Sequence, residues 1–492
     1  MSGSSSVVRS LTRALLLAVS LAPATRSEAQ AALPDSLRRK VDEVFARWDH
    51  TDTPGCAVGI SQQGRSVYQH GYGMSDMQHA LAITPLSIFH VASISKQFTA
   101  YSVALLAQDD KLSLDDNVRK YIPELPDYGT PITIRQLMHH VSGLRDQWQL
   151  LAYAGWREDD LITEQDVLTI VTRQKGTNFP PQREYLYSNT GFTLLAVIVK
   201  RVSGVSLREF AQHRIFAPLG MTRTHFHDDH AMIVPDRTSA YQPRGEGGWK
   251  ISIPVFDTYG ATSLFTTTGD LLTWMANLDH PVVGNAQLVS QAQTSAVLSD
   301  GTPANYGYGL TVGTYRGLRA IGHGGADAGY RAQVERYPER GLAIAVLCNA
   351  SSAVPGALLR RVADVMLGAS APPAAVAIDT VPRAVGRNLL ARWVGVYRDT
   401  VSQAVVRVAL SGDTLRLGDG RRLVSTSDTS VRIAESGNAF VLRLAGDRVA
   451  GITQVPRSTR TLFFGSEAPV TGFTLTDGRV RGVRFVRERQ GN

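Results

Sequence analysis

Ser93 and Lys96 are the residues whose types and spacing point most directly to chemistry. They stand three positions apart, in Ser93-Ile-Ser-Lys96, at the start of a long apolar stretch. On a helix, positions i and i+3 lie on one face, so the Lys96 amine can reach the Ser93 oxygen. Serine is a poor nucleophile unless a nearby base takes its proton. Lysine can be that base when burial lowers its pKa from about 10.4, and the apolar neighbours Phe98, Val103 and Leu105 supply the burial.

The start of this helix, which we expect from about residue 93 to residue 107, adds a second favourable feature. Free backbone N–H groups and the positive end of the helix dipole favour an oxyanion that develops at Ser93. A serine three residues before a lysine is a weak signal by itself. Lys96 is, however, the only one of the chain's seven lysines with that neighbour.

A second polar group is Tyr187-Ser-Asn189. A buried tyrosine near a cation can take or relay a proton, and an asparagine amide can hold a lysine and a substrate together. Tyr187 is the only one of 16 tyrosines with an asparagine two positions later. A core aromatic residue beside a helix cap explains the same residues, because an apolar helical run from 192 to 199 follows. The two interpretations are compatible.

A third group is His323-Gly324-Gly325, which closes a predicted strand. Glycines let a substrate pack against a strand edge, and the N–H of Ala326 is placed to donate to an oxyanion. This pattern alone is nearly uninformative, because a surface turn would also explain it.

Together and in this order, the three groups resemble the S-x-x-K, Y-x-N and K-T-G motifs of serine β-lactamases and penicillin-binding proteins. The resemblance is closest to the class C-like branch, with its D-aminopeptidases, DD-carboxypeptidases and esterases, and it covers residues 34–368. Residues 132–144, 219–221 and 307–310 also fit that branch. It implies no metal or cofactor, and it implies roles for individual residues. These are Ser93 as nucleophile, Lys96 and Tyr187 as the base pair, Asn189 as a contact of substrate and lysine, His323 as a substrate or proton-relay residue, and an oxyanion hole from the N–H groups of Ser93 and Ala326, with Gly324 and Gly325 beside the substrate.

One departure from the motif set bears on the function. The last lysine in the chain is Lys250, so His323 takes the place of the K-T-G lysine. Lysine there offers a substrate carboxylate a permanent charge, whereas histidine is charged only near or below its pKa of about 6.5. Relatives with histidine at this position include peptidases and esterases. We therefore expect an acyl-enzyme on Ser93 and a small-molecule or peptide substrate, either an ester or an amide derived from D-amino acids or peptidoglycan. The alternatives are a true β-lactamase and a catalytically silent binding protein.

A metallohydrolase is the second enzyme class to consider, because five possible ligands lie close together. They occupy one stretch with no second cluster at ligand spacing, so a solvated polar loop is the favoured interpretation. His139 and His140 are expected to pack or cap a helix end. The G-x-S-x-G elbow of another esterase fold is absent. The five possible ligands are His225, His227, Asp228, Asp229 and His230.

Strand signals occur at both ends of residues 32–368, and helices dominate between them. This order predicts an α/β (α+β) domain with a mixed, largely antiparallel sheet flanked by helices and interrupted by a helical insertion. We expect a helix over 37–48, a hairpin from 56–60 and 66–68, strands over 308–312, 320–322, 329–336 and 342–347, and a helix over 354–367.

The C-terminal region differs from the rest of the chain. Residues 369–386 are predicted to be a linker, and residues 387–492 contain short alternating runs typical of a small all-β, barrel-like domain. This domain holds 17 arginines against nine acidic residues, so it carries the whole net charge of +8. A solvated surface is the default interpretation, and contact with an anionic cell-wall polymer is the alternative. We expect no nucleic-acid partner.

Residues 1–31 have the pattern of a secretory signal peptide. Arg9 and Arg13 precede an apolar run over 14–22, and an A-x-A-like site ends at residue 31. The run is too short to span a bilayer, so we expect a periplasmic or secreted protein without stable membrane insertion after cleavage. An exported protein could pair its two cysteines, Cys56 and Cys348. Both lie in apolar runs, which favours two buried thiols in core strands.

Overall fold

A computed structural model describes residues 32–368 except Glu158 and Glu246, together with parts of the C-terminal region. The predicted signal peptide and linker lie outside the described residues. Within the described residues, no single helix is long and apolar enough to cross a membrane. One pair, Asn189–Ser203 with Leu207–Leu219, meets the requirements of length and composition together and is bent by 78°. The described C-terminal segments are 390–391, 394–398, 405–417, 422–427, 430–433, 439–445, 448–455, 461–462, 472–477 and 479–486.

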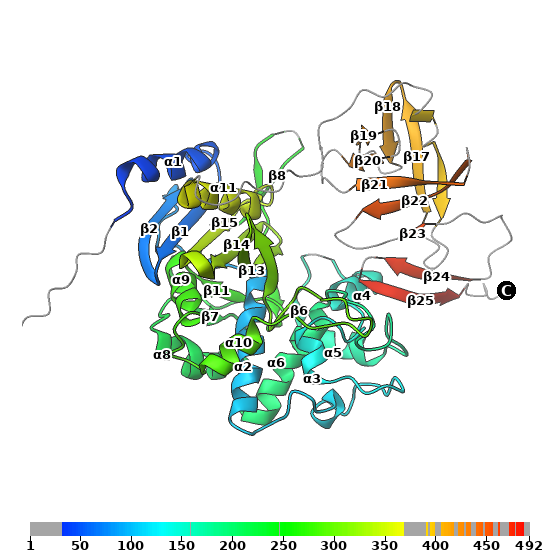
Figure 1. Cartoon of the computed structure of the whole chain (residues 1–492), viewed down its shortest axis with the longest axis horizontal. Helices are drawn as coiled ribbons and strands as arrows, with labels where there is room; N and C mark the ends of the chain where they lie inside the picture. Colours follow the sequence, from blue (N-terminus) through cyan, green and yellow to red (C-terminus); the bar gives the residue numbers. More distant parts are fainter. Residues whose placement is uncertain are drawn as a thin grey trace, which may run out of the picture.

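A six-stranded antiparallel sheet forms the centre of the domain over residues 32–368, in the order β12-β13-β14-β15-β1-β2 (Figure 1). Its strands come from both ends of the domain, which confirms the expected arrangement. Every strand pairing within this sheet is antiparallel. The strand expected over 308–312 is β12, which begins at Thr311. The strands are β1 (Cys56–Gln62), β2 (Arg65–Tyr72), β12 (Thr311–Tyr315), β13 (Leu318–Asp327), β14 (Tyr330–Tyr337) and β15 (Leu342–Cys348).

Helices cover both faces of this sheet, because its central strands are apolar on both sides. All seven residues of β15 are buried. Successive side chains of a strand point to opposite faces. Val346 packs in the cluster with α1 (Asp35–Phe45) and α11 (Pro355–Leu367), whereas Ala345 packs in the larger cluster with α2 (Ser95–Gln108) and α6 (Asn189–Ser203).

Cys56 and Cys348 form a disulfide, so the expectation of two free thiols was wrong. The two residues face each other in the register of β1 and β15, with their Cα atoms 4.0 Å apart. The expectation that both lie in buried core strands is correct, since each side chain is 0% exposed. The pairing depends on the register between strands 292 residues apart, which the sequence does not reveal.

The helical half of the domain is built around α2 (Ser95–Gln108) and α6 (Asn189–Ser203), which pack against each other (Figure 1). Residues 95–106 of α2 are all buried, because small and apolar residues occupy every side of the helix. The remaining helices are α3 (Ile134–Met138), α4 (Gln147–Tyr153), α5 (Glu164–Thr172), α7 (Leu207–Ala211), α8 (Ala217–Leu219), α9 (Thr268–Asn277) and α10 (Ala286–Ala292).

Short strand pairs connect these helices to the sheet. One three-stranded unit, in the order β5-β11-β7, packs beside the start of α2. The short strands are β3 (Met74–Asp76), β4 (Leu81–Ala82), β5 (Phe89–His90), β6 (Ile162–Thr163), β7 (His225–Phe226), β8 (Tyr241–Pro243), β9 (Trp249–Ile251), β10 (Phe256–Asp257) and β11 (Leu264–Thr266).

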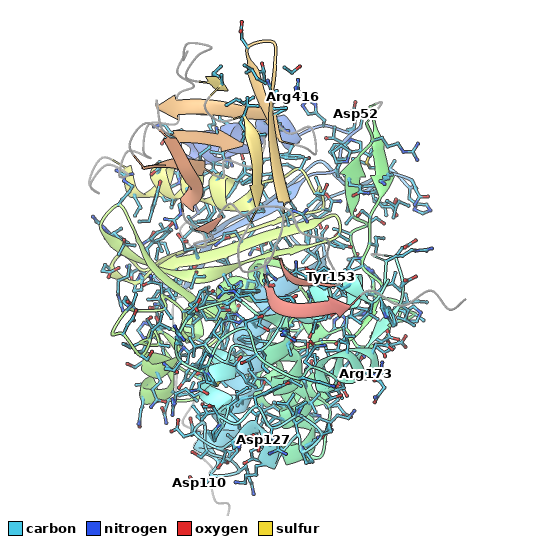
Figure 2. All side chains as sticks on the ribbon, turned by 90° about the vertical axis from the view of Figure 1, so that its right-hand side faces the viewer. Asp52, Asp110, Asp127, Tyr153, Arg173 and Arg416 are labelled. Atoms are coloured by element: carbon cyan, nitrogen blue, oxygen red, sulfur yellow. A yellow bond between two sulfur atoms is a disulfide. The ribbon has the colours of Figure 1, made fainter. Side chains whose placement is uncertain are left out.

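The described C-terminal strands form an antiparallel meander in which each strand pairs with the next, from β16 to β23. Pairings that would close the meander into the predicted barrel are not among those of the described residues. A separate hairpin, β24 (Gly472–Asp477) with β25 (Val480–Val486), lies beside α4 in Figures 1 and 2. The meander strands are β16 (Gly395–Arg398), β17 (Val405–Ser411), β18 (Thr414–Leu417), β19 (Arg422–Ser427), β20 (Ser430–Ile433), β21 (Ala439–Ala445), β22 (Arg448–Val455) and β23 (Thr461–Leu462).

Candidate active site

Lys96 lies at the centre of the site and donates hydrogen bonds to three oxygens. Its Nζ is 2.9 Å from Ser93 Oγ, 2.8 Å from Asn189 Oδ1 and 2.6 Å from the carbonyl oxygen of Ala261. Ser93 belongs to a 3₁₀ turn, Ala92–Ile94, and α2 begins two residues later than expected, at Ser95. The turn runs directly into α2 and keeps Ser93 within reach of Lys96.

Burial changes the chemistry of the Lys96 amine. The side chain is 0% exposed, and this desolvation lowers the pKa of Lys96 to about 7. The positive charge of Arg479 also lowers this pKa, whereas the carboxylates of Asp327 and Asp146 raise it. A lysine with this pKa is partly neutral at neutral pH and can accept a proton.

The backbone before Ser93 is held in an unusual conformation. Ala92 has a φ of +47°, in the left-handed region. Ser95 fixes this turn, because its hydroxyl donates to the carbonyl of Ala92 and accepts from the N–H of Leu264. Gly325 approaches closely from β13, and a Cβ there would lie 2.1 Å from the carbonyl oxygen of Val91. Strain of this kind is typical of functional sites.

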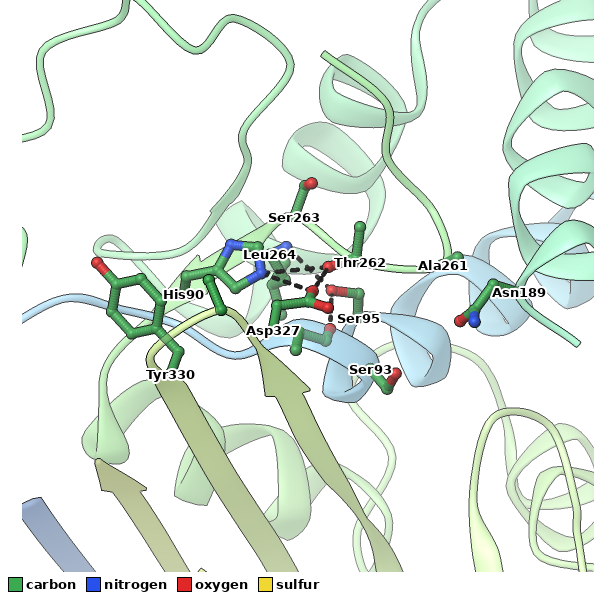
Figure 3. A network of polar contacts seen from close by, with 12 residues as sticks. His90, Ser93, Ser95, Asn189, Ala261, Thr262, Ser263, Leu264, Asp327 and Tyr330 are labelled. Atoms are coloured by element: carbon green, nitrogen blue, oxygen red, sulfur yellow. Dashed lines mark hydrogen bonds and ion pairs between the residues drawn. The ribbon is translucent and has the colours of Figure 1, made fainter. Parts of the chain in front are cut away.

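A buried polar network supports the same turn from the other side (Figure 3). His90 Nε2 lies 2.9 Å from Asp327 Oδ2, and the hydroxyl of Thr262 donates to the same oxygen. The His90 ring packs against Phe265 and Tyr330. Because Asp327 directly follows Ala326, the network fixes the end of β13 beside Ser93. No sequence motif marks His90, Thr262 and Asp327, which come from three segments far apart in the chain.

Tyr187 and Asn189 approach Lys96 from the start of α6. Tyr187 lies in the preceding loop, and the Lys96 amine is 4.9 Å from the centre of its ring. Asn189 is the first residue of α6 rather than a residue before it. Desolvation raises the pKa of the Tyr187 phenol above its usual range, and hydrogen bonding to Ser93 and the charge of Arg479 only partly oppose this. The phenol is therefore protonated at neutral pH.

His323 is buried and neutral rather than available as a cation. It is 5% exposed, and burial, followed by the charge of Lys96, lowers its pKa to about 3. Its Nδ1 faces the carbonyl oxygen of Gly324, which can only accept, so Nδ1 carries the proton. Its Nε2 then accepts from the Tyr306 hydroxyl at 2.8 Å. We expected His323 to become charged near pH 6.5. Its burial instead keeps the imidazole neutral at that pH.

His140 also belongs to the site, although only packing or capping of a helix end was predicted for it. The N–H of Ser188 donates to His140 Nδ1 at 3.1 Å, and the ring centre lies 4.1 Å from that of Tyr187. His139, its neighbour, bonds through Nδ1 to the carbonyl of Tyr306 at 2.8 Å. Both histidines follow α3 and position aromatic residues of the site. The histidine pair within residues 132–144 was the available signal for them.

The predicted solvated loop over 225–230 is solvated only in its second half. His227 is 4% exposed and packs against Phe265, with ring centres 4.4 Å apart. Asp229 and His230 are exposed, and they gather with Asp257 so that their ligand atoms lie within 4.8 Å of one another. His230 Nδ1 already pairs with Asp257 at 3.0 Å. We assign no metal to the cluster of Asp229, His230 and Asp257.

A cavity of about 870 Å³ opens beside the end of β13, where Ala326 and Asp327 line it. Trp148 and Phe256 stack on its wall with ring centres 4.9 Å apart, and Trp156 adds to this aromatic surface. This aromatic wall suits an apolar group of a substrate, whereas Asp159, Lys250 and Arg331 make other parts of the lining charged.

The structure thus gathers Ser93, Lys96, Tyr187, Asn189 and His323 into one site and brings Gly325 and Ala326 to its edge. This site and fold define a serine hydrolase, and comparison with known proteins agrees. A family model described as Beta-lactamase matches residues 41–366, and the chain belongs to this family.

Relatives in this family include D-aminopeptidases. The chain is 27% identical over 404 residues to the D-aminopeptidase of Cereibacter sphaeroides, covering 80% of this chain and 75% of the relative. It is 30% identical over 299 residues to that of Brucella canis, covering 60% of this chain and 56% of the relative. The chain is therefore similar to D-aminopeptidases over most of its length.

Solved structures share the fold. The octameric penicillin-binding protein homologue from Pyrococcus abyssi matches with a TM-score of 0.63 at 23% identity, over 87% of this chain and 99% of that chain. The D-amino acid amidase from Ochrobactrum anthropi SV3 matches with a TM-score of 0.56 at 22% identity, over 67% of this chain and 98% of that chain.

Proposed function

We propose that the protein hydrolyses amides or peptides of D-amino acids through an acyl-enzyme on Ser93. The observation that carries this proposal is the hydrogen bond of 2.9 Å between a fully buried lysine amine and the Ser93 hydroxyl. Because the pKa of Lys96 is lowered to about 7, this amine can act as a base at neutral pH.

In the proposed reaction, Ser93 Oγ attacks the substrate carbonyl and its proton passes to neutral Lys96. The N–H groups of Ser93 and Ala326 hold the oxyanion that forms. The protonated phenol of Tyr187 then passes a proton to the leaving nitrogen and is reprotonated from Lys96. The C–N bond breaks and leaves an ester on Ser93. Water attacks this ester with Lys96 again as base, which releases the acid and restores the Ser93 hydroxyl.

Two further observations support an amide or peptide substrate. The relatives are named D-aminopeptidases, and one neighbour is named a D-amino acid amidase. His323 is neutral, so the position that the K-T-G lysine takes in β-lactamases offers no permanent cation to the carboxylate of a β-lactam. Esters suit the same machinery, and the aromatic cavity suits an apolar side chain on the substrate.

Export to an oxidising compartment is part of the proposal. It rests on the signal-like pattern of residues 1–31 and is supported by the disulfide of Cys56 and Cys348, a bond typical of exported proteins. Cell fractionation with N-terminal sequencing of the mature protein tests it, and a cytoplasmic protein with an intact N-terminus would contradict it.

The decisive experiment combines labelling with a substrate panel. A fluorophosphonate should add one adduct to the intact protein, on the peptide containing Ser93. Ser93→Ala should lose the adduct and the activity, whereas Ser188→Ala, which leaves Oγ of Ser93 in place, should keep the adduct. D-Phenylalanine amide should be turned over faster than its L-enantiomer and faster than nitrocefin. An adduct on another serine would remove Ser93 as nucleophile, and faster turnover of nitrocefin would make β-lactamase the leading function.

A further inference from the structure

The tip of the C-terminal hairpin, residues 479–481, is docked beside the active site by several specific contacts. The carbonyl of Arg479 accepts from the N–H of Asp146 at 3.2 Å and from Asn178 Nδ2 at 3.0 Å. The N–H of Arg481 donates to Asn178 Oδ1 at 2.6 Å, and its guanidinium pairs with Glu184 at 2.9 Å. Val480 between them is 0% exposed. This is a defined docking of one segment, in which backbone and side chains both take part.

The side chain of Arg479 points from this tip into the site. Its Cζ lies 4.6 Å from the ring centre of Tyr187, and its Nη1 lies 3.6 Å from Oδ2 of Asp146. That same oxygen accepts from the backbone N–H and from Nδ2 of Asn189, each at 2.8 Å. Asn189 in turn holds Lys96. A continuous path of contacts therefore joins Arg479 to the lysine.

We propose that Arg479 is a positioning residue of the active site, through which the C-terminal hairpin completes the Lys96–Tyr187 pair. This inference rests on the proposed acylation of Ser93. It assigns a catalytic purpose to a region outside the residues that match the family, and it explains why one of many C-terminal arginines lies at the reacting groups.

Electrostatics give the reason. Lys96 is faced by the neutral groups Ser93, Tyr187, Asn189, Phe192, His140, His323 and the carbonyl of Ala261, and by the charged groups Asp146, Asp327 and Arg479. The two carboxylates favour the ammonium form of Lys96, and Arg479 opposes it. Asp146 is only 2% exposed, so its charge acts strongly unless a cation balances it. Arg479 supplies that cation and also favours ionisation of Tyr187.

The test uses the full chain and measures the rate of fluorophosphonate labelling of Ser93 from pH 5 to pH 10. In the unmodified protein, labelling should rise with a midpoint near 7, as neutral Lys96 forms. Arg479→Gln removes the opposing charge, so the Lys96 ammonium gains stability and the midpoint should move upward. A shift of about one pH unit reduces neutral lysine at pH 7 about fivefold, whereas the rate on the high-pH plateau should change little.

Two variants separate charge from docking. Arg479→Lys keeps the positive charge and should restore the original midpoint. Arg481→Gln removes a side-chain anchor of the same hairpin, which pairs with Glu184 and not with Tyr187, and should leave the midpoint unchanged. An unchanged midpoint in Arg479→Gln, or an equal shift in Arg481→Gln, would overturn the inference. Absence of any Ser93 adduct in the unmodified protein would instead remove the proposed function.

Discussion

The carboxylate of Asp146 receives both the backbone N–H and the side-chain amide of Asn189, each at 2.8 Å. Because Nδ2 of Asn189 donates to Asp146, the other end of the amide, Oδ1, faces Lys96 and accepts a hydrogen bond from its amine. A nearly fully buried carboxylate thereby sets the amide orientation at the site. The side chain of Asp146 also caps α4 by accepting from the N–H of Trp148 at 3.2 Å.

Asp146→Ala should therefore slow labelling of Ser93 on the high-pH plateau, where Lys96 is neutral with or without the charge of Asp146. Hydrogen bonds to a charged group are worth about 1.5–3 kcal/mol, so loss of the fixed Asn189 amide corresponds to about a 10- to 150-fold slower reaction. The free energy of unfolding should also fall, because the cap of α4 is lost. Asp127→Ala is the matched control, since Asp127 is exposed and its carboxylate contacts Arg119 and the N–H of Gly129 rather than Asn189. Equal labelling rates for both variants would contradict this role of Asp146.

The pH dependence of kcat/KM should show one limb, at about pH 7. Lys96 has its folded-state pKa lowered to about 7, so activity should be present above this pH and lost below it, as the base becomes protonated. His323 should add no limb between pH 5 and 8, because its pKa lies near 3. The raised pKa of Tyr187 keeps the phenol protonated beyond pH 9. A second limb near pH 6.5 that disappears in His323→Gln would contradict this assignment.

The disulfide should contribute to stability and not to chemistry. It closes a loop of 292 residues between β1 and β15, and such cross-links typically add about 2–4 kcal/mol. The double variant Cys56→Ala, Cys348→Ala should lower the free energy of unfolding in urea by about that amount. Labelling of Ser93 in the folded fraction should be unchanged, because both sulfurs lie in the cluster on the α1 and α11 side of the sheet. A free-thiol count of two in the native protein would show that the bond does not form.

The parts of the site that follow local rules could be predicted from the sequence. Ser93 with Lys96, and Tyr187 with Asn189, are separated by three and two residues, so a helix or its first turn is enough to bring each pair together. Asp146 and Arg479 could not be predicted, because folding brings them together from positions far apart in the chain. The burial that neutralises His323 is likewise a property of the packed fold. The same reason explains why the cysteine pair was missed.

Removal of metal should leave turnover unchanged. The cluster of Asp229, His230 and Asp257 is largely exposed, and one of its possible ligands already pairs with another. Dialysis against EDTA should therefore preserve hydrolysis of D-amino-acid amides and labelling of Ser93. His230→Ala provides a variant in which the cluster is broken, and its kcat should match that of the unmodified protein. Loss of activity in EDTA that zinc restores would revive a metal-dependent mechanism.

Discrimination against β-lactams should not depend on pH in the range where His323 was first expected to titrate. A β-lactam carries a fixed carboxylate, and a charge-assisted hydrogen bond to it is worth about 1.5–3 kcal/mol, or about 10- to 150-fold in kcat/KM. Neutral His323 cannot provide this bond, and its two nitrogens are already engaged by Gly324 and Tyr306. Uncharged p-nitrophenyl esters lose nothing by its absence and should be turned over more efficiently than benzylpenicillin. The ratio of kcat/KM for these esters to kcat/KM for benzylpenicillin should stay constant from pH 8 to pH 6, since both reactions share Lys96 as base. A ratio that shifts toward benzylpenicillin as the pH falls, and that no longer shifts in His323→Gln, would show that His323 gains a proton in this range and binds the carboxylate.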